Sequence, residues 1–166
     1  MEQIEPIYLI NDIEQNFNNK GMCCVEIDCY TQQEVKESLI YESGFPMLTN
    51  EYTNESPYEV DIDTSKFLND EYYDTYWFRI SNGVTIVYVC IKPIGEDLEI
   101  SAIETNNSYR NMGFGGTVIG GIELFALSNG FNSIVVSAFD SESERFWENN
   151  YYEKDELSGK MIKKSI

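Results

Sequence analysis

The chain has 166 residues, of which 42% are hydrophobic and 14% aromatic, enough for one domain with its own core. Its net charge of −18 repels nucleic acid and anionic membranes and attracts cationic partners, although the same charge also serves solubility. The absence of histidine excludes Ser-His-Asp and Cys-His catalysis and histidine-ligated metals. The four cysteines have no CxxC spacing, so we expect free thiols and no metal site.

No apolar run approaches the roughly 18 residues of a membrane span, and the first residues lack the basic segment of a signal peptide. We therefore expect a cytoplasmic protein. Residues 1–20 have no clean hydrophobic period, and their secondary structure is left open. Met22–Tyr30 favours a strand, and a capping box at Thr31 and Glu34 predicts a helix to about Glu42. Residues 48–75 are acidic, rich in tyrosine and interrupted by turn residues.

From residue 76 onward the sequence signals for strands, turns and helices are clearer. A strand Tyr76–Ser81, the turn Asn82–Gly83 and a strand Val84–Lys92 predict a hairpin. The later elements are a strand Asp97–Thr105, a helix from Gly116 to about Ser128, a strand Asn132–Ala138, a helix Ser141–Asn150 and two short strands Tyr151–Asp155 and Gly159–Lys164. Gly120 and Gly121 inside the first of these helices predict close packing on the sheet or on a ligand.

The segment Tyr109–Thr117 lies between a predicted strand and a predicted helix and contains three glycines, Gly113, Gly115 and Gly116. Glycine lets backbone N–H groups approach a ligand, and the N-terminus of a helix favours negative charge, so this segment predicts an anion site. A glycine-rich turn without a ligand is the alternative. The spacing fits neither the dinucleotide fingerprint nor the P-loop.

Two motifs resemble those of the GNAT superfamily of acyl-CoA-dependent N-acyltransferases. The first is Arg110-x-x-Gly113-x-Gly115, and the second is the segment Phe146–Tyr152, which is similar to the family's Phe-Tyr-Glu-Lys-x-Gly-Phe. The resemblance covers about residues 78–165. It implies an α/β (α+β) fold with a mixed, mostly antiparallel central sheet flanked by helices. The chain would form a single domain, 1–166, with a variable acceptor-side part at 1–75 and an acyl-CoA-binding core at 76–166.

The resemblance also implies the cofactor acetyl-CoA. Pantetheine would lie against the backbone of the strand ending at Thr105, and pyrophosphate would lie on the glycine loop, with Arg110 as the only nearby cation. The implied cofactor-binding residues are Ile103, Glu104, Thr105, Arg110, Asn111, Met112, Gly113, Phe114, Gly115, Gly116, Thr117, Asp140 and Trp147.

For the catalytic residues, Glu99 is the first choice as base, because it lies eleven residues before Arg110 and alternation places it on one strand face with Ser101, Ile103 and Thr105. Glu104, expected on the opposite face, and Asp97 are the alternatives, and each carboxylate can equally be a solvated strand residue. Trp147 stands where the family has a tyrosine acid, so Tyr151 or Tyr152 would substitute. Asp140 stands where the family has an asparagine.

The resulting expectation is N-acetylation of a primary amine on a cationic acceptor, a protein lysine or N-terminus in preference to a polyamine or aminoglycoside. The alternative is a catalytically silent protein that uses its acidic surface to bind a basic partner. For both of these expected functions we expect no direct binding of nucleic acid or membrane and no metal. Whether the protein forms a homodimer is left open.

Overall fold

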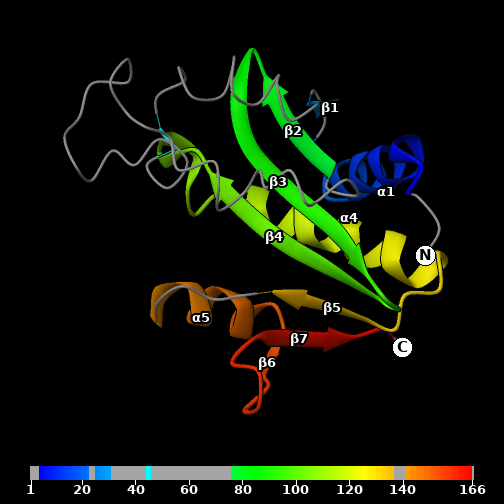
Figure 1. Cartoon of the computed structure of the whole chain (residues 1–166). Helices are drawn as coiled ribbons and strands as arrows, with labels where there is room; N and C mark the ends of the chain where they lie inside the picture. The colour runs from blue at the N-terminus through cyan, green and yellow to red at the C-terminus, as the bar shows by residue number, and fades with distance from the viewer. Residues whose placement is uncertain (1–3, 23–24, 31–43, 46–75, 137–140, 166) are drawn as a thin grey trace, which may run out of the picture.

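The computed structural model describes residues 4–22, 25–30, 44–45, 76–136 and 141–165. These residues form one seven-stranded sheet with helices packed against it (Figure 1). The strands are β1 (Glu26–Tyr30), β2 (Tyr76–Asn82), β3 (Val84–Ile94), β4 (Asp97–Thr105), β5 (Ser133–Val136), β6 (Glu153–Lys154) and β7 (Met161–Lys164). The helices are α1 (Pro6–Asn19), α4 (Phe114–Ser128) and α5 (Ser141–Asn149), with a 3-10 turn at Asn107–Tyr109.

The strand order is β1-β2-β3-β4-β5-β7-β6, and all neighbours are antiparallel except β4 and β5. The parallel pair results from the crossover through α4, which connects the end of β4 to β5. The predicted mixed, mostly antiparallel sheet flanked by helices is confirmed. The predicted hairpin is also present, with Gly83 alone between β2 and β3 in a left-handed conformation, φ +77°. In the described part of the chain, no helix is long and apolar enough to cross a membrane.

Within the segment 1–20, left open from the sequence, Pro6–Asn19 forms α1. Pro6 stands in its first turn, where no backbone N–H is needed, and Leu9, Ile13 and Phe17 follow at helical spacing and are fully buried. Helix α1 lies beside α4 on one face of the central strands (Figure 1). The predicted helix Thr31–Glu42 and the segment 48–75 lie outside the described residues.

The paired glycines of α4 contact α1, and this corrects the expectation that they pack on the sheet or on a ligand. A Cβ built on Gly121 would lie 2.5 Å from the Cα of Ile13, and one built on Gly120 would collide with the side chain of Asn16. Glycine therefore lets the two helix backbones approach. Asn16 Nδ2 donates to the carbonyl of Thr117 at 2.8 Å, which fixes α1 to the first turn of α4.

A β-bulge in β4 changes which side chains share a face. Ala102 pairs with Cys90, whereas Ile100 pairs with the next residue, Ile91, so Ser101 is an extra residue on β4. Beyond the bulge the alternation is shifted by one residue. Glu99 therefore shares a face with Glu104, and the expectation that these carboxylates lie on opposite faces was wrong because strict alternation ignores the extra residue.

Candidate functional site

The site lies where β4 and β5 diverge. Their pairing joins Leu98–Ile100 to Ile134–Val136, while β4 continues to Thr105 (Figure 1). Among the described residues, the edge of β4 from 101 to 105 thus has no strand partner on this side, although its other edge pairs with β3. The N–H and C=O groups of such an edge can bind another extended chain.

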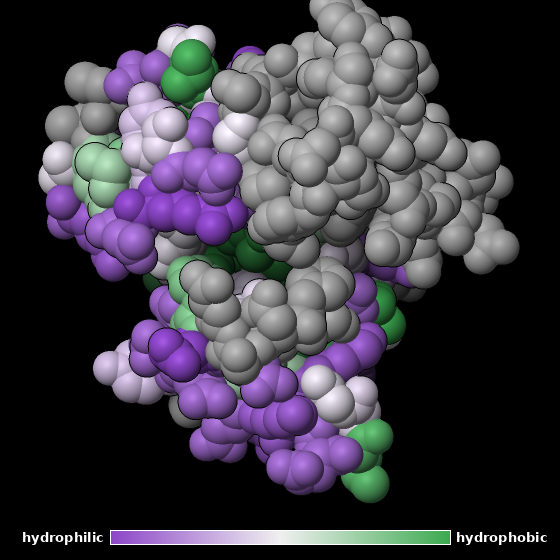
Figure 2. All heavy atoms as spheres, turned by 90° about the vertical axis from the view of Figure 1, so that its left-hand side faces the viewer, coloured by the Kyte–Doolittle hydropathy of each residue, from purple (hydrophilic) through white to green (hydrophobic). Residues whose placement is uncertain are grey.

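A pocket of about 560 Å³ occupies this opening. One wall is β4 with the loop that follows it and the start of α4, and the opposite wall is α5, with Val136 of β5 between them. Figure 2 views this side of the molecule and shows a hollow with hydrophobic atoms at its floor and hydrophilic residues along the described part of its rim. The pocket is therefore bordered by backbone on one side and by helix side chains on the other.

The glycine loop presents backbone donors to this pocket. Gly113 caps α4 in a left-handed conformation, φ +85°, and the first intrahelical N–H bond runs from Thr117 to the Gly113 carbonyl at 3.1 Å. The N–H groups of Phe114, Gly115 and Gly116 precede this bond, and all three residues line the pocket. The segment predicted to bind an anion thus leads into the first turn of a 15-residue helix, whose dipole favours negative charge.

Gly115 also permits a close approach between α4 and β4. A Cβ at this position would lie 3.2 Å from Thr105 Oγ1 and 3.6 Å from the ring of Phe146 on α5. Any side chain larger than hydrogen would therefore crowd Thr105 and Phe146, which line the pocket together with Gly115. This explains a glycine in the first turn of a helix, where its conformational freedom would otherwise be a cost.

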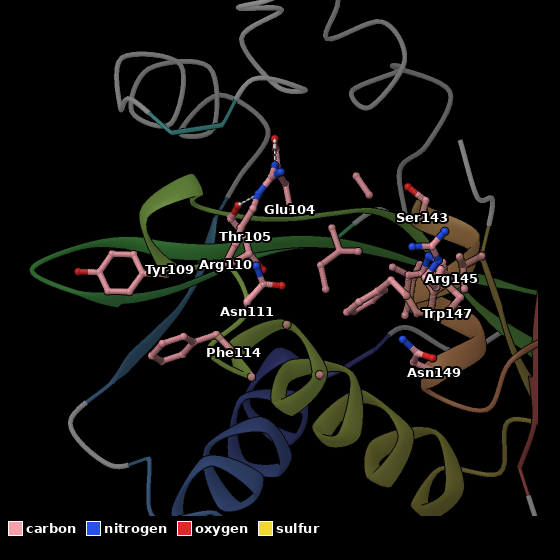
Figure 3. Close-up of a pocket in the computed structure, with 18 of the residues that line it drawn as sticks. Glu104, Thr105, Tyr109, Arg110, Asn111, Phe114, Ser143, Arg145, Trp147 and Asn149 are labelled. Atoms are coloured by element: carbon pink, nitrogen blue, oxygen red, sulfur yellow. Dashed lines mark hydrogen bonds and ion pairs between the residues drawn. The ribbon is translucent and has the colours of Figure 1, made fainter. Parts of the chain in front are cut away.

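Glu104 is the carboxylate that the structure places in the pocket. Its side chain is 2% exposed, and Oε1 accepts a hydrogen bond from the hydroxyl of Tyr88 at 2.9 Å. Oε2 lies 3.8 Å from Nη2 of Arg110, whose Nε donates to the carbonyl of Thr105 at 3.5 Å (Figure 3). Burial, followed by the charge and hydrogen bond of Glu104, raises the pKa of Tyr88 well above its usual value, so its hydroxyl stays protonated.

Glu99 lies outside the pocket lining. Its Oε2 is 3.4 Å from Nζ of Lys160, in the loop before β7, and its Oε1 accepts a hydrogen bond from Ser101 at 3.3 Å. The carboxylate is thus held by a lysine at the start of the divergence between β4 and β5. The bulge places it on the same face as Glu104, five residues away along the chain.

Three other predicted residues also lie apart from the pocket. Met112 is 59% exposed, and Tyr151 is 82% exposed, with Nζ of Lys163 5.6 Å from its ring centroid. Thr117 is buried, and its hydroxyl donates to the Gly113 carbonyl at 2.7 Å, so it stabilises the first turn of α4. Asp140 lies outside the described residues.

The other predicted residues come together around the pocket: Ile103, Glu104, Thr105, Arg110, Asn111, Gly113, Phe114, Gly115, Gly116 and Trp147. Trp147 is 4% exposed and packs against Tyr152, with ring centroids 4.9 Å apart. Tyr152 is itself in the core, and its hydroxyl donates to Glu123 at 3.4 Å. Neither tyrosine considered as an acid, Tyr151 or Tyr152, is thus among the residues of the pocket wall.

Most of the α5 wall was not predicted from the sequence. Ser143, Arg145 and Asn149 line the pocket beside Trp147 (Figure 3). Ser143 was detectable, because it precedes Trp147 by one helical turn. Arg145 corrects the statement that Arg110 is the only nearby cation. Its position was not readable from the motif, because it depends on how α5 is rotated against the sheet.

The comparison with solved structures agrees with this architecture, whereas the two comparisons of sequence found no match: no protein-family model and no curated protein matches the sequence. The fold is similar to an acetyltransferase of the GNAT family from Staphylococcus aureus Mu50, with a TM-score of 0.64 and 14% identity over 86% of this chain and 99% of that one. The chain has the GNAT fold.

Two further GNAT-fold structures are similar. The PaiA N-acetyltransferase of Thermoplasma acidophilum, in complex with coenzyme A, has a TM-score of 0.61 and 17% identity over 84% of this chain and 99% of that one. The ribosomal-protein-S18-alanine N-acetyltransferase of Escherichia coli has a TM-score of 0.56 and 10% identity over 85% of this chain and 94% of that one. At these identities the likeness establishes the fold.

Proposed function

We propose that the protein transfers the acetyl group of acetyl-CoA to a primary amine. The observation that carries this proposal is the edge of β4 at 101–105, which pairs with no described strand on the side of β5 and leads through the loop 106–113 into the N-terminal turn of α4. One pocket thereby offers strand-like backbone groups to the amide-containing pantetheine arm and helix N–H groups to pyrophosphate. The Thermoplasma structure of the same fold contains coenzyme A, which supports the choice of cofactor.

The residues of the pocket fit acetyl-CoA group by group. Ile103 and Thr105 would meet the pantetheine arm through their backbone, and Phe114, Gly115 and Gly116 would hold the pyrophosphate through N–H groups. Arg110 would balance its charge from the loop. When bound, the cofactor supplies an activated acetyl group as a thioester. Trp147 and Val136, both buried, would give the bound thioester an apolar surrounding.

Glu104 is proposed to accept the proton of the amine, in place of Glu99. An alkylamine such as lysine has a reference pKa of about 10.4, so at neutral pH a base must take its proton before or during attack. Glu104 lines the pocket, and Tyr88 holds one of its oxygens in place. Glu99, by contrast, lies outside the lining. Whether the base is Glu104 or Glu99, its carboxylate would take the proton directly or through a water molecule.

The acceptor is proposed to be cationic, with a protein lysine or N-terminus preferred to a polyamine or aminoglycoside. A chain with net charge −18 attracts basic segments over a distance set by the salt concentration. The Escherichia coli enzyme of the same fold acts on an alanine of a ribosomal protein, which is a precedent for a protein amine. We expect acetylation to slow as salt rises, mainly through slower association.

Isothermal titration with acetyl-CoA tests the cofactor, and we expect micromolar binding. Release of free coenzyme A thiol is then measured with two acceptor pools, a mixture of basic proteins and a panel of polyamines and aminoglycosides. Thiol release with the protein pool supports the proposed acceptor, and release only with small molecules contradicts it. No heat and no thermal shift at millimolar acetyl-CoA would reject the cofactor.

A catalytically silent protein on the same fold is the second candidate. It is favoured by the α5 wall, where Trp147 has no useful acidity and the exposed Tyr151 lies away from the pocket. Such a protein would bind acetyl-CoA and a basic partner without releasing thiol. Binding of the cofactor without turnover on either acceptor pool would support this candidate.

A further inference from the structure

Arg145 stands on the wall of the pocket opposite the glycine loop (Figure 3). It belongs to α5, whereas Arg110 comes from the loop between β4 and α4. The pocket therefore has a guanidinium on each side. A chain with 11 basic and 29 acidic residues has few cations to place, so two arginines at one pocket indicate an anionic ligand with charge on both sides.

The two arginines differ in their partners. Arg110 forms an ion pair with Glu104 at 3.8 Å. Three lysines also form ion pairs: Lys154 with Glu144, Lys160 with Glu99 and Lys163 with Glu123. Arg145 makes no ion pair with any described residue, although Glu144 precedes it on α5. Its guanidinium is exposed on the pocket side and carries a charge that no described carboxylate within reach neutralises.

We infer that Arg145 binds the 3′-phosphate of coenzyme A and makes the protein selective for coenzyme A over its dephospho form. This inference rests on the proposed function. Coenzyme A carries two anionic groups, the pyrophosphate and the 3′-phosphate, and its pantetheine arm is neutral. The N–H groups of α4 and Arg110 account for the pyrophosphate from one wall. The phosphate left for a cation on the other wall is the 3′-phosphate, and guanidinium matches it with two parallel hydrogen bonds.

The test is a cycle of two proteins and two ligands. Isothermal titration measures the dissociation constants of coenzyme A and dephospho-coenzyme A for the wild type and for Arg145→Gln. A hydrogen-bonded charge pair corresponds to about a 10- to 100-fold change in affinity. We expect the wild type to bind coenzyme A at least about tenfold more tightly than the dephospho form. In Arg145→Gln that ratio should fall to about one, with the affinity for the dephospho form unchanged.

Two control variants separate a contact from a general loss of positive charge. Lys154→Gln removes the same charge from β6, beside α5, where Lys154 pairs with Glu144, and should leave both affinities unchanged. Arg145→Lys should keep part of the selectivity, because lysine supplies charge without the planar pair of donors.

Each other outcome overturns the inference in its own way. If Arg145→Gln loses the same affinity for both ligands, Arg145 contacts a part of the cofactor that the two ligands share. An unchanged ratio would remove Arg145 from the cofactor altogether. If the wild type binds neither ligand, the proposed function fails first, and the role of Arg145 fails with it.

Discussion

The two walls of the pocket are built in different ways. The wall of β4, the glycine loop and the first turn of α4 offers mainly backbone groups: the edge at 101–105, which pairs with no described strand on this side, and the N–H groups of Phe114, Gly115 and Gly116. The α5 wall offers side chains, among them Arg145 and Trp147. A backbone wall needs glycine at particular positions and tolerates other changes, whereas a side-chain wall changes its chemistry with each substitution.

This difference separates binding from catalysis. The motif residues of the backbone wall reach the pocket, which is consistent with a retained cofactor site. On the other wall, Trp147 is buried and its indole N–H has no useful acidity, and the exposed Tyr151 is not among the residues that line the pocket. The described residues of the α5 wall therefore offer no tyrosine to protonate the leaving thiolate.

The largest effect is expected from Gly115→Glu on the backbone wall. A Cβ there would lie 3.2 Å from Thr105 Oγ1, so the longer side chain must project into the pocket and carry negative charge to the phosphate site. We expect acetyl-CoA binding to weaken by at least about 100-fold, which corresponds to about 2.7 kcal/mol of binding free energy. Isothermal titration measures the loss, and far-UV circular dichroism should stay close to wild type.

The matched control is Leu127→Glu, which adds the same charge near the other end of the same helix at a position 52% exposed. Its affinity for acetyl-CoA should equal that of the wild type. Weak binding in both variants would mean that the overall charge, and not the glycine loop, controls the affinity.

A smaller effect is expected from Glu104→Gln, which removes the proposed base and retains its shape. Turnover should fall by about 100-fold at pH 7, within the usual range for a general base. The defect should shrink as pH rises toward the pKa of the acceptor amine, because more of the amine is then already deprotonated. Thiol release measured from pH 6 to 9 gives this profile.

Glu99→Gln is the matched control for Glu104→Gln, because it neutralises a carboxylate on the same strand face and outside the pocket. It should change turnover less than about threefold. The opposite order of effects, with Glu99→Gln the slower enzyme, would return the role of base to Glu99 and assign Glu104 to structure.

The smallest effect concerns Tyr151, which has a left-handed backbone with φ +69°. Glycine adopts this conformation without steric cost, whereas alanine retains the cost, of about 1 kcal/mol. Tyr151→Gly should therefore melt about 2–4 °C above Tyr151→Ala, measured by thermal denaturation. Both variants lose the contact with Lys163, so that contact cancels in the comparison. Turnover should be unchanged in both, and a tenfold loss in both would restore Tyr151 as the acid.

Most of the β-sheet could be predicted from the sequence because its strands carry local signals. The Asn82–Gly83 turn, the runs of β-branched residues and the stop at Gly130 depend on nearby residues alone. The glycine loop was predictable for the same reason. Helix α1 was not, because its propensity signal is weak and its stability comes from Leu9, Ile13 and Phe17 packing against α4.

The sequence by itself determined the glycine loop and the order of strands and helices from residue 76 onward, because each rests on short-range spacing. Tertiary structure decided which carboxylate enters the pocket, since the extra residue Ser101 appears only in the pairing of β4 with β3. It also decided that Arg145 lines the pocket and that Tyr151 does not. The rotation of a helix and the register of a strand are set by packing with distant segments, and a single sequence does not record that packing.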